Sequence, residues 1–105
     1  MLENIKEDEI FKDIPNYEGL YQVSNYGRVW SIHKQRILKP AVSHNGYNRI
    51  YLKCKNGKYK NERVARLVAL TFIPNPEGKP QVDHIDHDRV NDYVGNLRWV
   101  SVQEN

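Results

Sequence analysis

Two adjacent polar residues near the end of the sequence could together carry out acid–base chemistry beside a metal ion. Asp83 and His84 follow the apolar Val82, and two asparagines, Asn96 and Asn105, come 12 and 21 positions after His84. A histidine titrates near neutral pH and can therefore act as a general base. The side-chain oxygens of Asp83 and Asn105 are hard donors, which suit a divalent cation such as Mg²⁺.

The surrounding residues predict a strand, a loop, a second strand and the start of a helix. A polar loop separates Val82 from the apolar segment 97–100, and residues 101–104 have the Ser-x-x-Glu pattern of a capping box. Neighbouring residues on a strand point to opposite faces, so Asp83 and His84 can share a site only at a strand end or a bulge. The remaining acidic and histidine residues of the loop are predicted to be solvated: Asp86, His87, Asp88 and Asp92.

This arrangement resembles the HNH nuclease motif, also called the ββα-metal or His-Me finger, and most closely that of HNH homing endonucleases of phage introns. The resemblance rests on Asp83-His84, on Asn96 within the segment 96–100, and on Asn105. It implies that His84 is the base, that Asp83 and Asn105 bind Mg²⁺ (or Mn²⁺), and that Asn96 ties down the loop. It further implies hydrolysis of DNA phosphodiester bonds to a 5′-phosphate and a 3′-hydroxyl. Asp86 remains a weaker alternative ligand, and Asn91 a weaker alternative to Asn96.

The N-terminal half reads as antiparallel strands. Residues 1–10 are predicted to be a frayed or loosely helical, acidic lead without function. Residues 20–32 contain two short strands around a turn at 25–27, and the segment 11–32 resembles a small module, found beside many intron-type HNH nucleases, that is thought to bind DNA. Residues 36–39 predict a further strand. Along residues 47–54, Ile50, Leu52 and Cys54 alternate with an outward row of Tyr47, Arg49, Tyr51 and Lys53.

A hairpin and a helix complete the predicted elements. Asn56-Gly57 predicts a two-residue turn, with residues 58–60 as the returning strand. Between residues 62 and 72 the apolar spacing becomes helical, through Val64, Leu67, Val68, Thr71 and Phe72. This helix is predicted to pack on the sheet and on the C-terminal hairpin.

The charge is divided unevenly along the chain, whose net charge is +3. Residues 14–72 carry 11 basic and 2 acidic side chains, a net +9, whereas residues 73–105 carry 3 basic and 6 acidic, a net −3. A basic stretch beside an acidic one suits a polyanion-binding surface next to a cation site. We therefore predict binding to duplex DNA through six residues: Arg28, Arg49, Tyr51, Lys53, Lys58 and Lys60.

These observations predict an α+β protein with an N-terminal antiparallel sheet packed against one helix, followed by the ββα-metal motif. The predicted modules are residues 11–60, which bind DNA, and residues 61–105, which hold the nuclease site. The single cysteine, Cys54, excludes an internal disulfide or a Cys-paired zinc site. With no apolar run of membrane-spanning length and no signal-peptide order, we expect a monomer in the cytoplasm of a bacterial or phage-infected cell.

Three alternatives remain open at this point. The chain could be a DNA-binding module that does not cleave, or a fragment of a longer HNH nuclease whose last helix is just beginning. A protein-interaction domain without nucleic-acid binding is the most distant alternative.

Overall fold

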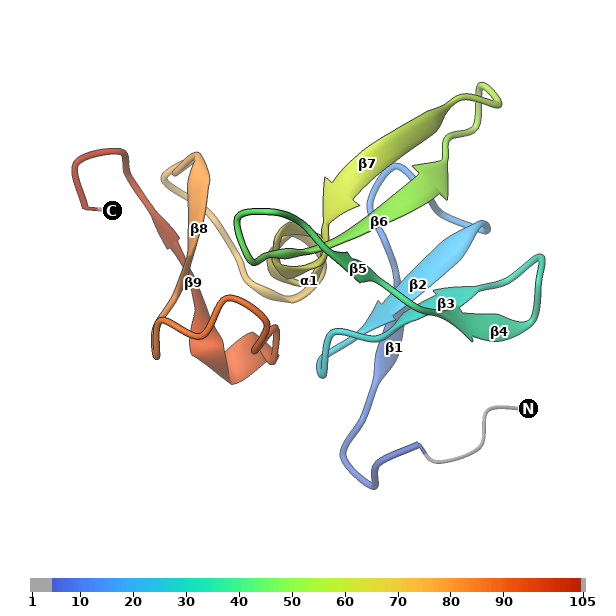
Figure 1. The fold of residues 1–105 in the computed structure, drawn as a ribbon, viewed down its shortest axis with the longest axis horizontal. Coiled ribbons are helices and arrows are strands. Elements are labelled where there is room, and N and C mark those ends of the chain that lie inside the picture. Colours follow the sequence, from blue (N-terminus) through green and yellow to red (C-terminus); the bar gives the residue numbers. More distant parts are fainter. Residues whose placement is uncertain (1–4, 105) are drawn as a thin grey trace.

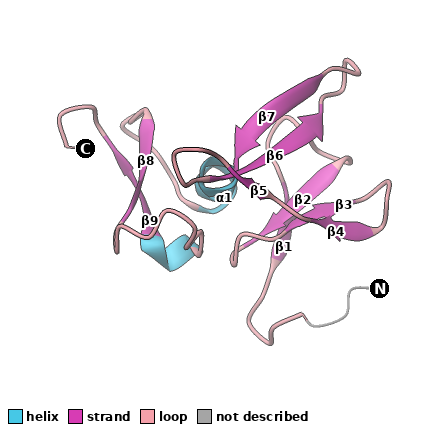
Figure 2. Ribbon diagram, viewed as in Figure 1, coloured by secondary structure: helices cyan, strands magenta, loops and turns pink. Residues whose placement is uncertain are grey.

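The computed structural model describes residues 5–104, so Asn105, predicted as a metal ligand, lies outside the described residues. These residues form short antiparallel strands and one α-helix, which confirms the α+β class (Figures 1 and 2). No helix in this part of the chain is long and apolar enough to cross a membrane. In chain order the elements are β1 (Phe11–Asp13), β2 (Tyr21–Ser24), β3 (Val29–Ser31), β4 (Arg36–Leu38), β5 (Ala41–Val42), β6 (Asn48–Lys53), β7 (Tyr59–Arg63), α1 (Val64–Phe72), β8 (Gln81–His84), the 3-10 turn η1 (Val94–Asn96) and β9 (Leu97–Val100).

The N-terminal sheet has the order β1–β2–β3–β4, and each neighbouring pair is antiparallel. The predicted hairpin forms from β2 and β3, with Val23 opposite Val29. Gly27 closes their turn with a φ of 85°, a conformation that residues with a side chain rarely adopt. Val23 and Val29 are buried and belong to the core. β1 was not predicted, because three residues reading Phe-Lys-Asp carry no alternation that identifies a strand.

The second sheet, β5–β6–β7, shows the alternation predicted for residues 47–54. Ile50 and Leu52 are buried, whereas Tyr51 is 66% exposed. The predicted two-residue turn is wrong: the Cys54 N–H donates to the Lys58 carbonyl at 2.7 Å, which leaves residues 55–57 as a three-residue loop. Three-residue hairpin loops place a glycine in the left-handed region, and Gly57 has a φ of 86°.

The helix α1 lies between the N-terminal sheets and the C-terminal hairpin (Figure 1). Val64, Leu67 and Val68 are buried, as the helical spacing predicts. The helix begins at Val64 rather than at Glu62, because β7 continues its pairing with β6 through Arg63. β7 therefore spans the predicted module boundary between residues 60 and 61 and leads directly into α1. One hydrophobic core contains residues from both predicted modules.

The C-terminal hairpin pairs β8 with β9 in regular register, from Gln81 opposite Val100 to His84 opposite Leu97. Trp99 is buried, and its indole N–H donates to the Ile73 carbonyl at 3.0 Å. The capping box forms after β9. The Ser101 N–H donates to the Glu104 carboxylate at 2.9 Å, and the Glu104 N–H donates to the Ser101 hydroxyl at 3.2 Å. These two reciprocal hydrogen bonds are those of a helix N-terminus, at the position that the sequence predicted.

The acidic lead is tied to the N-terminal sheet, so its description as frayed is wrong for residues 8–10. Glu9 is buried, and the Arg28 guanidinium donates to both of its carboxylate oxygens, at 2.5 and 2.8 Å. These hydrogen bonds from Arg28 lower the pKa of Glu9 to about 2. The Ile10 N–H also donates to the Asn25 side chain at 2.8 Å. Arg28 is thus committed to an ion pair that holds the lead in place.

Candidate active site and nucleic-acid groove

His84 is the last residue of β8, which provides the strand end that the predicted site needs. Its side chain is only 4% exposed, and its ring lies 5.8 Å from the Tyr47 ring. Its Nε2 atom lies 2.8 Å from the Asp92 carboxylate. Within the described residues, every buried side-chain nitrogen or oxygen has a hydrogen-bond partner, whereas Nδ1 of His84 makes no such bond. Nδ1 therefore reaches solvent, as a general base must.

Asp92 does not lie in solvent, so the sequence prediction for it is wrong. It is 5% exposed, and its carboxylate accepts one hydrogen bond from His84 and one from the Asn48 side chain, the latter at 3.0 Å. The turn between β2 and β3 also presses against it: a Cβ on Gly27 would lie 2.9 Å from the Asp92 Cβ. Asn48 and Gly27 are far from Asp92 in the sequence, and no local pattern could reveal that they meet.

Asn96 holds the loop between β8 and β9, the role that the resemblance implied. Its side-chain oxygen accepts from the Asp86 N–H at 3.0 Å, and its amide donates to the Asp86 carboxylate and to the Asn91 carbonyl, each at 2.9 Å. The Asn91 side chain donates to the other Asp86 oxygen at 2.9 Å. These bonds, that from Asn91 first, lower the pKa of Asp86. Asp86 is thus an organiser of the loop that places His84.

Asp83 lies beside His84 on β8 and opposite Arg98 on β9. The Arg98 Nε donates to Asp83 Oδ2 at 2.9 Å, which leaves Oδ1 for a cation. Magnesium is commonly held by one or two protein oxygens together with waters and substrate phosphate, so this hard donor fits such an ion. Residues 5–104 contain no cluster of three or more His, Cys, Asp or Glu placed to hold a metal ion.

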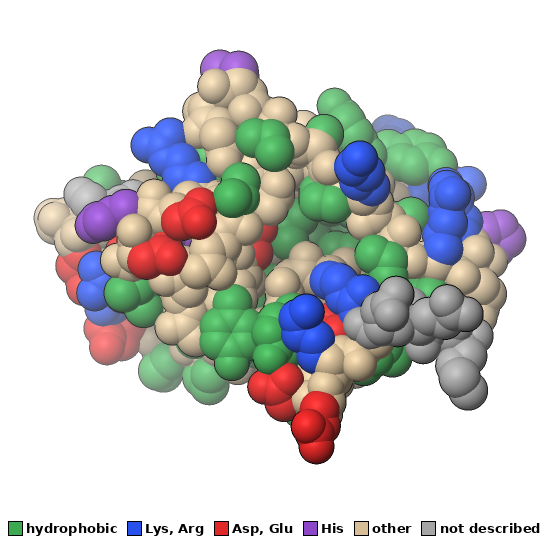
Figure 3. Space-filling view, turned by 60° about the horizontal axis from the view of Figure 1, so that its bottom comes forward, with side chains coloured by type: hydrophobic (Ala, Val, Ile, Leu, Met, Phe, Trp, Pro, Cys, Tyr) green, Lys and Arg blue, Asp and Glu red, His purple; other side chains and the backbone are tan. Residues whose placement is uncertain are grey.

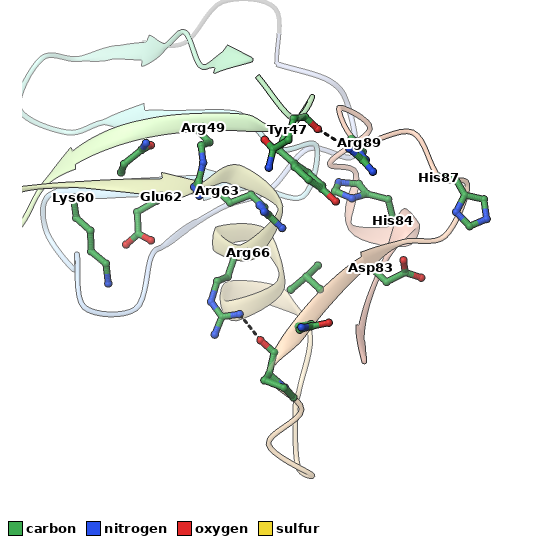
Figure 4. Close-up of a pocket in the computed structure, with 15 residues that line it drawn as sticks. Tyr47, Arg49, Lys60, Glu62, Arg63, Arg66, Asp83, His84, His87 and Arg89 are labelled. Carbon is green, nitrogen blue, oxygen red and sulfur yellow. Dashed lines mark hydrogen bonds between the residues drawn. The ribbon is translucent and has the colours of Figure 1, made fainter. Parts of the chain in front are cut away.

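A groove of about 880 Å³ connects this site with the β6–β7 hairpin. Figure 4 shows Asp83, His84 and Arg89 at one end of it and Lys60 and Glu62 at the other. Its acidic lining residues are Glu62 and Asp83. Five basic side chains line it: Arg49, Lys60, Arg63, Arg66 and Arg89. The groove therefore combines the candidate base with a surplus of positive charge.

Several of these arginines are held in place by neighbouring groups. The guanidinium carbons of Arg63 and Arg89 lie 3.8 and 4.9 Å from the centre of the Tyr47 ring. Arg66 donates to the Pro80 carbonyl at 2.8 Å, and Arg89 to the Asn45 carbonyl at 2.7 Å. These contacts cut the freedom of the side chains, which lowers the entropy lost when they bind an anion.

Arg49 lies directly opposite Arg63 in the pairing of β6 with β7. Like charges directly opposite one another destabilise an antiparallel pair. Both residues line the groove, so an anion lying there would relieve the repulsion. The pair is better suited to binding a polyanion than to stabilising the hairpin.

The structure separates the predicted DNA-binding residues into three groups. Arg49 and Lys60 line the groove, and Tyr51 lines a neighbouring hollow together with Arg49. Lys53 and Lys58 are exposed on the β6–β7 hairpin but do not line the groove. Arg28 forms an ion pair with Glu9 and does not line the groove.

Three of the groove arginines were not among the residues predicted from the sequence to bind DNA. Arg63 and Arg66 lie in the segment that was interpreted as a core helix. The net positive charge of residues 14–72 was the one feature of the sequence that could have marked them as candidates for DNA binding. Arg89 lies in a loop that is otherwise acidic. Figure 3 shows one face, on which acidic side chains gather over the lead and the C-terminal part, while Lys and Arg side chains lie both among them and over the N-terminal sheets.

Two protein-family models match the chain in succession. Residues 9–53 match the NUMOD4 motif, and residues 56–105 match an HNH endonuclease model. The DNA endonuclease I-HmuI of Bacillus phage SP01 is 46% identical over 95 residues, which cover 90% of this chain and 54% of that protein. The uncharacterized HNH endonuclease L247 of Acanthamoeba polyphaga mimivirus is 42% identical over 104 residues, or 95% of this chain and 26% of that protein.

A solved structure, described as DNA binding and cleavage by the HNH homing endonuclease I-HmuI, has the same fold. The TM-score is 0.83 at 46% sequence identity, and the match covers 91% of this chain and 55% of that chain. The chain thus spans about half the length of I-HmuI and about a quarter of L247. The two family models together span both the β-rich N-terminal part and the β8–β9 hairpin that carries Asp83 and His84. The chain is thus homologous to the HNH homing endonuclease I-HmuI, with a NUMOD4 motif preceding its HNH motif.

Proposed function

We propose that this chain is a divalent-metal-dependent endonuclease that binds duplex DNA and nicks one strand. The observation that carries the proposal is the groove, which brings the base His84 and the hard donor Asp83 to one end of a surface lined by five basic residues. Positive side chains in such a groove neutralise the phosphates of a nucleic-acid backbone and position it. The solved relative is described as binding and cleaving DNA, which supports the same function here.

In this reaction His84 is the base. Its Nδ1 takes a proton from a water molecule while the water oxygen forms a bond to phosphorus. The bond between phosphorus and the 3′ oxygen breaks, and that oxygen takes up a proton from solvent. The products are a 5′-phosphate and a 3′-hydroxyl. Asn96 supports the step by holding the loop that follows His84.

HNH nucleases generally use a divalent metal ion. We infer that Asp83 and Asn105 hold Mg²⁺ or Mn²⁺ in this chain. Such an ion, when bound, neutralises charge on the phosphate and stabilises the leaving oxygen.

We place the DNA interface on the groove and on the adjoining hairpin. Arg49, Lys60, Arg63 and Arg66 would contact the backbone near the site, while Tyr51, Lys53 and Lys58 would extend the contact along β6 and β7. Arg28 lies outside this interface because it is paired with Glu9. One chain holds one site, so a monomer would nick a single strand, in the cytoplasm of a bacterial or phage-infected cell.

Plasmid nicking is the direct test of this function. With Mg²⁺ or Mn²⁺ present, we expect the chain to convert supercoiled plasmid to the open-circular form, and EDTA to stop the conversion because the ion is required. Gel electrophoresis separates the two forms. Salt-sensitive binding to duplex DNA without any nicking would identify a DNA-binding module that does not cleave. Absence of both binding and nicking would refute the proposal.

The affinity for DNA should depend on the groove residues. Replacing both Arg49 and Lys60 with Gln should weaken binding and make the dependence of log K on log salt shallower by about 2, because each phosphate contact contributes a slope of roughly 0.9. Fluorescence anisotropy of a labelled duplex at several salt concentrations measures this slope. The matched control replaces Lys6 and Lys12, which lie on the lead and on β1 away from the groove, and should leave the slope unchanged. If the Lys6/Lys12 variant lowered the salt slope as much as the Arg49/Lys60 variant, the groove would not be the main DNA interface.

A further inference from the structure

We propose that Asp92, held by Asn48, is a positioning residue that sets the tautomer and the direction of the His84 imidazole. The proposal rests on the proposed function, because His84 is the base of that reaction. It assigns to the β5–β6–β7 sheet a second task besides binding DNA: Asn48, the first residue of β6, fixes the group that orients the base in the C-terminal hairpin.

The hydrogen bonds around an ionised Asp92 place a proton on Nε2 of His84. A carboxylate only accepts hydrogen bonds, so both of its partners must donate. Nδ2 of Asn48 donates to Oδ2 at 3.0 Å, and Nε2 of His84 must therefore carry the proton that it shares with Oδ1 at 2.8 Å. With its proton on Nε2, a neutral imidazole has its lone pair on Nδ1. That is the nitrogen that reaches solvent, where it can accept a proton from water.

Burial makes this arrangement rigid. The His84 and Asp92 side chains are each only 4% exposed, so water does not compete for their hydrogen bond. The backbone at Asp92 and directly after it is also fixed by the N-terminal part of the chain. The Val94 N–H donates to the Asn25 carbonyl at 2.9 Å, and Gly27 approaches too closely to admit a Cβ. Tyr47, which precedes Asn48, packs its ring near that of His84.

The decisive variant is Asp92→Asn, which keeps the shape of the side chain. Asn48 should continue to donate, because its Nδ2 also donates to the Val90 carbonyl at 3.5 Å. It would therefore hold the carbonyl oxygen of the new amide and turn the amide NH₂ toward Nε2 of His84. Nε2 would then have to accept, and the imidazole proton would move to Nδ1. The base would be lost, and kcat for nicking should fall by about 10- to 100-fold or more, with little change in KM for DNA.

Exchanging the two residues should reverse this loss. In the variant Asn48→Asp/Asp92→Asn, the carboxylate at position 48 accepts from the amide at position 92, which turns its carbonyl oxygen toward His84. Nε2 can donate again, and kcat should return to within about tenfold of the original chain. A residue that served the fold alone would give no such recovery. Asp88→Asn removes a carboxylate from the same loop without touching His84 and should leave kcat unchanged.

Two-bond ¹H–¹⁵N correlation spectra measure which nitrogen of the His84 imidazole carries the proton, independently of any cleavage assay. The unaltered chain, at a pH where imidazole is neutral, should show His84 protonated at Nε2, and its signal is assigned by its absence in His84→Ala. Asp92→Asn should shift the proton to Nδ1, and the exchanged pair should restore it. An Nδ1-protonated His84 in the unaltered chain would overturn the proposal, as would wild-type kcat in a folded Asp92→Asn variant. Failure of the unaltered chain to nick DNA would instead refute the proposed function, while the spectra would still decide the tautomer.

Discussion

His84→Ala should lower the rate of DNA nicking by roughly 10²- to 10⁴-fold, the contribution that a well-placed general base makes to a hydrolytic step. Its affinity for duplex DNA should stay close to that of the unaltered chain, because the groove charge comes from the five arginine and lysine side chains. The alanine side chain also leaves Asp92 with Asn48 as its remaining partner among the described residues. Single-turnover nicking with saturating protein separates the chemical step from binding.

The control for this variant is His33→Ala, which removes an exposed histidine away from the groove and should leave the nicking rate unchanged. Thermal melting of both variants checks that the fold is intact. If folded His84→Ala nicks plasmid at the unaltered rate, another group must activate the water. His87, which lines the same groove, would then be the next residue to test.

Much of the candidate site could be predicted from local sequence because its parts follow one another along the chain. Asp83, His84 and Asn96 lie within 14 residues, on one hairpin whose register is set by its own pairing. The capping box at Ser101 and Glu104 is likewise a local motif, and it forms as predicted. The alternation of Ile50 and Leu52 with outward side chains also gave the correct face of β6, since strand periodicity is a local property.

The contacts that the sequence could not reveal join residues far apart in the chain. Asn48 and Asp92 are separated by 44 positions, and Glu9 and Arg28 by 19. An aspartate in a polar loop is usually solvated, so burial of Asp92 depends on the approach of the β2–β3 turn. Arg28 was predicted from the basic stretch to bind DNA, and nothing in the sequence indicated that its guanidinium pairs with Glu9. For Asp92 and for Arg28, the environment of the side chain depends on a partner that is distant in the sequence.

The position of the groove also required the fold. Arg63 and Arg66 straddle the junction of β7 and α1, where the strand passes into the helix without a loop. Arg63 is the last residue of β7 and Arg66 lies in the first turn of α1, and both side chains line the groove together with residues of β8. The sequence predicted a helix from Glu62, which gave no reason to place Arg63 on a strand beside Arg49. The sequence could therefore predict a basic stretch, but not which of its charged side chains would line the same groove as His84.

Asp83→Ala should abolish nicking, a loss of more than about 10³-fold, because a bound metal ion stabilises the transition state by several kcal/mol. Raising the Mn²⁺ concentration should not restore activity if the carboxylate is a direct ligand. The same substitution also breaks the hydrogen bond between Arg98 and Asp83, so its effect alone does not distinguish a ligand from an ion-pair partner.

Arg98→Ala separates these two roles. It breaks the same pair while keeping the carboxylate, and the Arg98 side chain is 59% exposed, so the pair contributes less than about 1 kcal/mol to stability. Its nicking rate should stay within about fivefold of the original, a difference of roughly 1 kcal/mol in the barrier. Titration of Mg²⁺ and Mn²⁺ against nicking for both variants gives the comparison. Equal losses in Asp83→Ala and Arg98→Ala would make the ion pair, rather than metal binding, the function of Asp83. Activity retained in Asp83→Ala would exclude it from the metal site.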